Sequence, residues 1–421
     1  MIKSRSPWWF VPSLYFQQGL PVILVQQLSV LMYKKMGVSN DKIGLWTSLI
    51  TWPWILKMLW GPLVDRYSSK RQWMQRAQVG ITVLLFFAAL VITQTNFLAL
   101  SLVLFFIMAF FSATHDNALD AYYLVALPPE KQAFFLGIRS TFFRLAMIFC
   151  TGGLVVLAGT LESRGVAIAQ SWQWAIFAAA FVYGVLMLYG RWAAPVFEHD
   201  VSVQVPSAYL TAFRSFFSQD RVAVILLFIL LYRFGESMLT KMSGLFLLDA
   251  REVGGLGLTT LQVGVIVGNI GMLSLVAGGI LGGITISRYG LKRCIWPMAL
   301  TMHIPNLFYL WAAKTQPGIE SVGLIVAVDQ FAYGFGLASY MVFAMNVSQR
   351  SVIKASHYAI ATGVMALGAM FAGISSGYLQ KALGYPGFFL AVCLATIPGM
   401  ILIFFLPLET KKVQTEAEEE T

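Results

Sequence analysis

Residues 61–71 read GPLVDRYSSKR, and residues 283–293 repeat the glycine, arginine, tyrosine, lysine and arginine of this string as GITISRYGLKR. Each copy follows an apolar stretch that is too long for a core helix of a soluble protein. The duplication therefore predicts a membrane-embedded helical bundle that occurs twice in one chain. Two similar bundles in a membrane protein are typical of transporters.

The composition also indicates a membrane protein. Of 421 residues, 58% are hydrophobic and 11% are charged, which is too little polar surface to cover a soluble globule of this size. Most of the lysines and arginines behind the net charge of +10 lie in short gaps between apolar spans or at the chain ends, so they indicate membrane topology and not a nucleic-acid partner. Cys150, Cys294 and Cys393 lie far apart with no histidine cluster, so we expect no disulfide framework, metal site or cofactor.

Twelve apolar stretches approach the length of about 20 residues that a helix needs to cross a bilayer. They occupy residues 8–33, 43–63, 74–93, 97–127, 134–161, 172–189, 222–248, 261–286, 294–313, 322–347, 358–383 and 388–408. A polar segment divides them into two sets of six, which predicts an all-α membrane protein with twelve transmembrane helices in two pseudo-symmetric six-helix bundles. The expected units are an N-terminal bundle at 1–190, a cytoplasmic linker at 191–221, a C-terminal bundle at 222–408 and an acidic cytoplasmic tail at 409–421.

The distribution of basic residues predicts how the chain crosses the membrane. If the N-terminus is cytoplasmic, seventeen lysines and arginines lie in the gaps and ends on that side, against seven on the other side. Basic residues favour the cytoplasmic side. We therefore expect a multi-pass protein of the inner (cytoplasmic) membrane with both termini in the cytoplasm.

The first copy of the repeated string resembles the cytoplasmic signature G-x-L-x-D-R-x-G-R-R of the major facilitator superfamily. Ser68 replaces its second glycine, and in the second copy Ser287 replaces the acid. The resemblance implies a conformational latch between rocking bundles, stronger in the first copy; the alternative is a basic loop at the headgroups with a helix-packing glycine. The candidate latch residues are Gly61, Asp65, Arg66, Arg71, Arg288 and Arg293.

Longer strings are similar to those of AmpG-type muropeptide permeases and of the related siderophore permeases and acetyl-CoA transporters. Residues 56–67, LKMLWGPLVDRY, resemble K-F-L-W-x-P-L-x-D-R-Y, and residues 112–121, SATHDNALDA, resemble S-A-x-Q-D-x-x-x-D-A. His115 departs from the family, which often has glutamine there. The resemblance implies proton-coupled import of anhydromuropeptides, which are sugar-peptide cell-wall fragments, by alternating access. A siderophore or an acyl-coenzyme A is the alternative substrate.

Four acids within the predicted spans are candidates for proton coupling, because an unpaired acid in a bilayer needs a partner, a proton or water. Asp116 and Asp120 are four residues apart and share one helix face. Asp116 has an alternative role in a static ion pair with Arg144, and Asp120 in a structural hydrogen bond. The alternative for Asp329 is a hydrogen bond in the neighbourhood of Tyr333 or Gln330. The proton-coupling candidates are Asp116, Asp120, Asp329 and Glu236.

Amides and cations in the spans are candidates for substrate binding. Gln17 and Gln18 suit sugar hydroxyls and peptide bonds, although such amides also join helices. Arg233 suits a carboxylate or phosphate unless Glu236 neutralises it. Lys57 either snorkels to the headgroups or pairs with an acid, and Trp54 either belongs to an interfacial belt or stacks on a sugar. The full set is Gln17, Gln18, Arg144, Arg233, Trp54 and Lys57.

The function classes that remain are few. The sequence has no G-x-x-x-x-G-K-[ST] string, so it does not encode transport driven by nucleotide hydrolysis. A membrane-embedded transferase would need a catalytic histidine or paired acids near the surface, and His115 beside Asp116 lies too deep. We expect a transporter and not an enzyme, working as a monomer in the lipid bilayer on a small-molecule substrate and protons.

Overall fold

The computed structural model describes residues 6–57, 60, 69–127, 129–196, 214–349 and 354–408. Three predicted latch residues, Gly61, Asp65 and Arg66, lie outside the described residues. So do most of the predicted linker and the whole predicted tail at 409–421.

The first half of the chain consists of helices joined by short turns. They are α1 (Val11–Ile23), α2 (Ser29–Lys35), α3 (Asn40–Leu49), α5 (Lys70–Val91), α6 (Phe97–Ala126), α7 (Pro129–Met147), α8 (Val155–Ser163) and α9 (Ile168–Ala193). π-Helical turns at Leu24–Leu28 and Ile148–Leu154 connect α1 to α2 and α7 to α8. Each of these pairs therefore forms one continuous span.

The second half repeats this organisation. It comprises α11 (Val222–Leu231), α12 (Phe234–Leu248), α13 (Thr260–Val263), α14 (Met272–Tyr289), α15 (Leu291–His303), α16 (Asn306–Thr315), α17 (Ile319–Ser348) and α18 (Lys354–Leu402). A π-helical segment at Gly264–Gly271 connects α13 to α14. Pro305 separates α15 from α16, since proline has no N–H and clashes with the preceding turn. Gly384 divides α18 into two helices. Its own backbone angles, φ 65° and ψ 176°, are readily adopted by glycine but not by residues with a side chain.

The predicted all-α membrane fold is confirmed, and each predicted span coincides at least in part with a described helix. In the described part, eight helices are long and apolar enough by themselves to cross a membrane. α9 extends the predicted span 172–189 at both ends. Within that span the Gln173 amide donates to the Ala89 carbonyl at 3.1 Å, so the neighbouring helix α5 satisfies this polar side chain.

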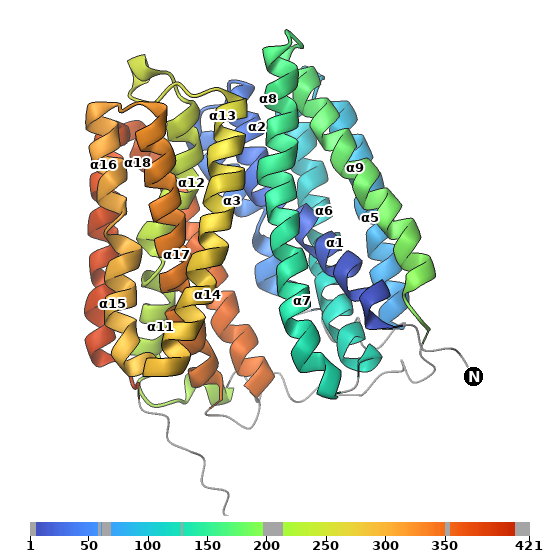
Figure 1. The fold of residues 1–421 in the computed structure, drawn as a ribbon, viewed down its shortest axis with the longest axis vertical. Helices are drawn as coiled ribbons and strands as arrows, with labels where there is room; N and C mark the ends of the chain where they lie inside the picture. Colours follow the sequence, from blue (N-terminus) through green and yellow to red (C-terminus); the bar gives the residue numbers. More distant parts are fainter. Residues whose placement is uncertain are drawn as a thin grey trace, which may run out of the picture.

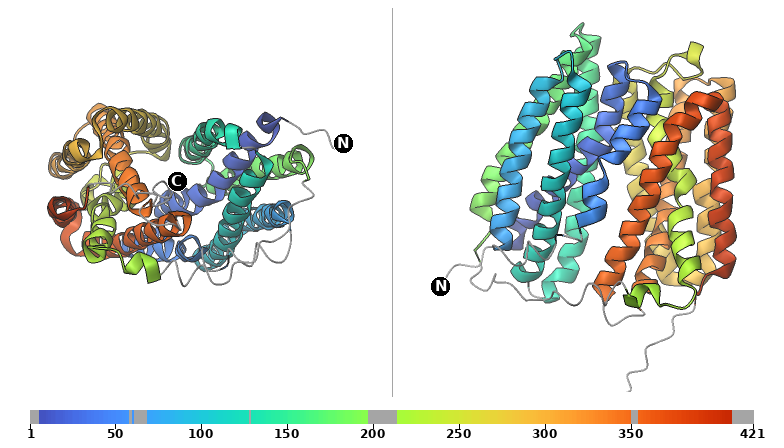
Figure 2. Two further views of the ribbon diagram at one scale, coloured as in Figure 1. Left: turned by 90° about the horizontal axis from the view of Figure 1, so that it is seen from below. Right: turned by 180° about the vertical axis from the view of Figure 1, so that it is seen from behind.

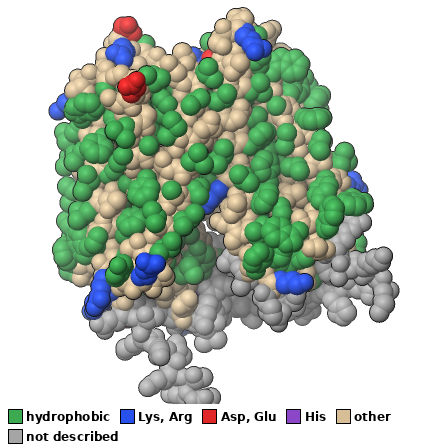
Figure 3. Space-filling view, in the orientation of Figure 1, with side chains coloured by type: hydrophobic (Ala, Val, Ile, Leu, Met, Phe, Trp, Pro, Cys, Tyr) green, Lys and Arg blue, Asp and Glu red, His purple; other side chains and the backbone are tan. Residues whose placement is uncertain are grey.

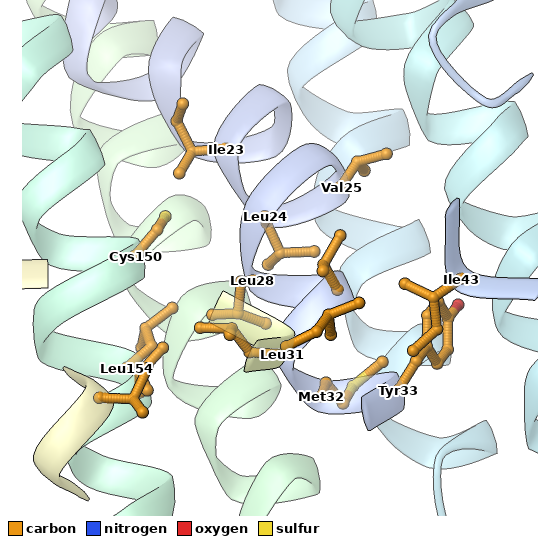
Figure 4. Packing of buried hydrophobic residues seen from close by; sticks show 14 of the residues in the cluster. Ile23, Leu24, Val25, Leu28, Leu31, Met32, Tyr33, Ile43, Cys150 and Leu154 are labelled. Atoms are coloured by element: carbon orange, nitrogen blue, oxygen red, sulfur yellow. The ribbon is translucent and has the colours of Figure 1, made fainter. Parts of the chain in front are cut away.

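The described helices form two groups, α1–α9 and α11–α18, that lie side by side (Figure 1; Figure 2). Near the chain ends each group has its own apolar core, around Tyr122 in the first half and Phe228 in the second. At the opposite end, called here the far end, one core joins both halves and includes Leu31 and Met242; Figure 4 shows part of it. The seam between the halves is thus filled at the far end.

Polar contacts also join the halves at the far end. Lys34 of α2 forms an ion pair with Asp249, which follows α12. Asn40 of α3 donates to the Asp249 carboxylate at 3.2 Å and to Oε1 of Gln380 at 2.8 Å. Because these side chains come from helices of different halves, they hold the far end of the seam together.

Glycines allow the helix backbones to meet across the same seam. A Cβ on Gly268 would lie 2.2 Å from the Thr151 carbonyl oxygen and 2.3 Å from Gly152, which precede α8. A Cβ on Gly377 of α18 would lie 2.4 Å from the carbonyl of Asn40. Any larger side chain at these positions requires the two halves to separate.

Candidate functional site

A cavity of about 490 Å³ lies between the two halves. The first half contributes Tyr15, Gln18, Lys57, Asp116, Asp120, Arg139, Ser140, Phe143, Arg144 and Met147, and the second half contributes Leu275, Gly279, Tyr333, Gly334 and Leu337. The charged side chains among these residues therefore all belong to the first half. Figure 3 shows basic surface in the seam between largely hydrophobic surfaces.

Two ion pairs form the charged wall of the cavity. Lys57 pairs with Asp116 of α6, and the side chain of Asn117 donates to the Lys57 carbonyl at 2.9 Å. Arg139 of α7 donates to Oδ1 of Asp120 at 2.8 Å. The Tyr15 hydroxyl donates to the same oxygen at 3.1 Å, and the Arg139 guanidinium lies 4.5 Å from the centre of the Tyr15 ring. Of the two roles predicted for Lys57, the structure shows the ion pair.

Arg144 is not the partner of Asp116, so that predicted pairing is wrong. Lys57 pairs with Asp116 instead. Arg144 makes no hydrogen bond or ion pair within the described part of the chain, although it lines the cavity. Its guanidinium faces Gly279 of α14, where a Cβ would lie 3.4 Å from both terminal nitrogens.

The two adjacent glutamines of α1 have different surroundings. Gln17 is buried in the first half, where its Nε2 donates to the Tyr183 carbonyl at 3.3 Å and its Oε1 accepts from Gln78 at 3.0 Å. Gln78 also contacts Nε2 of His115 at 3.2 Å. Gln18 lines the cavity. Gln17 therefore joins helices, and Gln18 is the amide available to a ligand.

Arg233 does not pair with Glu236, although the two are three residues apart. The helix is interrupted at Arg233, between α11 and α12, and the guanidinium donates to the hydroxyl of Tyr333 and lies 5.2 Å from the centre of that ring. Tyr333 lines the cavity and Arg233 does not, so Arg233 contacts a residue of the cavity wall without lining the cavity itself. Arg233 and Glu236 thus form no ion pair, although the two charges still act on each other.

A second group of buried polar residues lies within the second half. Glu236 is 0% exposed, and neither of its carboxylate oxygens has a hydrogen-bond partner. The amide of the neighbouring Asn306, at the start of α16, is also buried and unpaired. Asp329 of α17 accepts from Nε2 of Gln330 at 3.0 Å and from the Tyr309 hydroxyl at 3.5 Å, while its Oδ1 has no partner. This buried group therefore contains two acids, and no Lys or Arg side chain of the described residues forms an ion pair with either of them.

Trp54 lies outside the cavity and packs against the apolar core of the far end. Arg71 donates to the carbonyl oxygens of Ala194 at 3.0 Å and Arg191 at 2.8 Å, so it satisfies backbone groups at the end of α9. Arg288 and Arg293 are exposed and form no ion pair within the described residues.

Arg139, the partner of Asp120, is not among the site residues expected from the sequence. The signal was present, because Arg139 is a cation in the predicted span 134–161. Asn306 was also missed, and its signal was weaker: an amide directly after Pro305, where helix interruption leaves polar groups exposed to the interior.

Comparison with known proteins gives consistent results. The family described as Major Facilitator Superfamily matches residues 15–365. An anhydromuropeptide permease of Escherichia coli (strain K12) is 26% identical over 92% of this chain and 77% of that protein. Putative transporter AmpG 2 of Rickettsia prowazekii (strain Madrid E) is 24% identical over 94% of this chain and 95% of its own length.

A solved structure shows the same fold. The crystal structure of the nucleoside transporter NupG has a TM-score of 0.69 at 18% identity and covers 94% of this chain and 96% of its own. The family match spans most of the residues that form both helical groups and the cavity. This chain belongs to the major facilitator superfamily, as an AmpG-like multi-pass membrane transporter of a small-molecule substrate.

Proposed function

We propose that this chain is a proton-coupled secondary transporter of the inner membrane that imports anhydromuropeptides. The name of the Escherichia coli relative supports this class of substrate. The observation that carries the proposal is the cavity between the halves, whose wall combines two ion pairs, an amide and aromatic rings.

The cavity suits a ligand that contains both a sugar and a peptide. Its volume of about 490 Å³ is in the range of small-molecule sites. Gln18 has no hydrogen bond within the described part of the chain and offers both a donor and an acceptor. The rings of Tyr15, Phe143 and Tyr333 provide apolar faces for a sugar ring. Amide and aromatic groups together match sugar hydroxyls, peptide bonds and apolar sugar faces.

We infer that transport follows alternating access, with the far end outside the cell. The excess of basic residues on the side of the chain ends supports cytoplasmic termini. In that orientation, the joined far end and the separate cores near the chain ends correspond to an inward-facing state. In a monomer, rocking of the two bundles, 1–190 and 222–408, against each other opens the cavity to the outside of the cell. The loop with Gly61, Asp65 and Arg66 is the proposed latch.

We assign the coupled proton first to Glu236 and Asp329. Asp116 and Asp120 each have a cation in contact, so both can remain charged without a proton. Glu236 has no hydrogen-bond partner and Asp329 has one unpaired oxygen, in a group without a contacting cation. A carboxylate inside a membrane without a counter-charge needs a proton. Protonation of this buried group is the proposed link between the gradient and the movement of the halves.

Uptake of labelled anhydromuropeptide into proteoliposomes, with and without an inward proton gradient, tests the proposal. We expect uptake against a concentration gradient only when the proton gradient is present. Uptake that ignores the proton gradient would disprove proton coupling. Uptake of a siderophore or an acyl-coenzyme A in place of the muropeptide would replace the substrate assignment.

A further inference from the structure

The cavity wall carries one cation more than it carries acids. Lys57 is paired with Asp116, and Arg139 with Asp120. Arg144 remains as a guanidinium without a hydrogen bond or an ion pair in the described part of the chain. A charged group held in a membrane cavity without a counter-charge points to an anionic ligand.

The space for such a ligand is the cavity that Arg144 lines. The guanidinium faces Gly279, where a Cβ would lie 3.4 Å from both Nη1 and Nη2 and 3.8 Å from the carbonyl of Gly334. These are ordinary van der Waals distances, so the guanidinium lies close to the α14 backbone at Gly279 and is open to a ligand from the side of the cavity that it lines. The second half contributes no charged side chain to the described wall, so no acid of that half competes for Arg144.

The chemistry of the Arg144 guanidinium defines which kind of ligand it can bind. The guanidinium is planar and presents two N–H groups that match the two oxygens of a carboxylate. We propose that Arg144, on the cavity side of its guanidinium, forms an anion subsite for a carboxylate of the transported ligand. Arg144 belongs to α7 and the neighbouring Gly279 to α14, so a carboxylate bound there lies where the two halves meet. This inference rests on the proposed transport function and adds that the ligand must carry a negative charge.

Equilibrium binding to the purified protein tests the subsite with two forms of one ligand. The probes are labelled anhydromuropeptide with free carboxylates and the same molecule with its carboxylates amidated. We expect the acid form to bind roughly tenfold more tightly, as a charge-assisted bidentate contact implies. Arg144→Gln should remove this preference by weakening only the acid form, and Arg144→Lys should restore part of it.

Ser140→Ala is the matched control, because Ser140 lines the cavity one turn before Arg144 on α7 and carries no charge. It should keep the preference for the acid form. Equal affinity of the unaltered protein for both probes would overturn the subsite. So would an Arg144→Gln protein that loses affinity for both probes to the same extent, since that result indicates a structural role.

A second measurement needs no substrate. In a protein without Cys150, Cys294 and Cys393, Ser140→Cys is labelled with an anionic and a cationic methanethiosulfonate reagent. The positive charge of Arg144 should make the anionic reagent react faster with the Ser140→Cys protein than the cationic reagent does, and Arg144→Gln should abolish this difference in rate. If neither muropeptide probe binds but the labelling preference is present, the proposed substrate fails and the subsite stands. If the labelling preference is absent, the subsite is wrong.

Discussion

Lys34 of α2 forms an ion pair with Asp249 beyond the end of α12, and this pair joins the two halves of the molecule at the end away from the chain termini. The side chains are only 16% and 13% exposed, so water screens the pair weakly. Asp249 also accepts from the Tyr385 hydroxyl at 2.6 Å. This carboxylate thus collects contacts from α2, α3 and α18, and it is the centre of the far-end closure.

Replacing Asp249 with asparagine should favour opening at the far end. The substitution leaves Lys34 without its counter-charge and weakens the bond from Tyr385, which costs the closed state roughly 1–3 kcal/mol. Spin labels at the exposed residues Arg164 and Glu252 would report a larger population of long distances. Glu320→Gln removes an exposed acid at the same end and should leave the distances unchanged. An unaltered distribution for Asp249→Asn would show that the apolar core alone holds this end closed.

Neutralising the unpaired acids should separate proton coupling from ligand exchange. With Glu236→Gln or Asp329→Asn, the site no longer gains or loses a proton, so accumulation driven by a proton gradient should disappear while counterflow exchange persists. Proteoliposome uptake under both conditions makes the comparison. Asp220→Asn, at an exposed acid near α11, is the control and should retain accumulation. Retained accumulation in both the Glu236→Gln and the Asp329→Asn proteins would assign the proton to another group.

Lys57 and Asp116 should show strong coupling in their effects on stability. Lys57→Met leaves the Asp116 carboxylate unpaired and should destabilise the protein by roughly 1–3 kcal/mol, because the pair is only partly buried. The double variant Lys57→Met with Asp116→Asn should recover much of this loss. Thermal unfolding in detergent measures the four proteins of the cycle. Additive losses would mean that the two side chains act independently.

Gly268→Ala should interfere with closure of the far end. The new methyl group would meet the Thr151 carbonyl and Gly152 at impossible distances, and such overpacking costs roughly 1–3 kcal/mol. The clash exists only while the two halves are in contact, so transport should slow while each half stays folded. Gly323→Ala, which has no atom within 4 Å of the added methyl group, is the control. Normal transport rates for Gly268→Ala would indicate that this contact opens and closes without constraint.

Some of the candidate site was predictable, and the failures have a common cause. Asp116 and Asp120 were correctly expected on one face of one helix, because a spacing of four residues is nearly one turn. The cations that pair with these two acids could not be predicted from depth in the membrane alone. Gln17 and Gln18 are adjacent, yet a rotation of about 100° per residue turns one into the first half and the other to the cavity.

The sequence by itself determined the architecture, since a bilayer accepts few spanning structures and requires apolar helices of a known length. The repeat at 61–71 and 283–293 added that the bundle occurs twice. Only the tertiary structure decided that Asp120 meets Arg139 and that Arg144 faces Gly279. Arg139 and Arg144 differ by five residues, which is about 7.5 Å along the helix and more than a third of a turn around it. Such differences depend on how α7 packs against its neighbours, because side-chain partners are set by rotation and depth together.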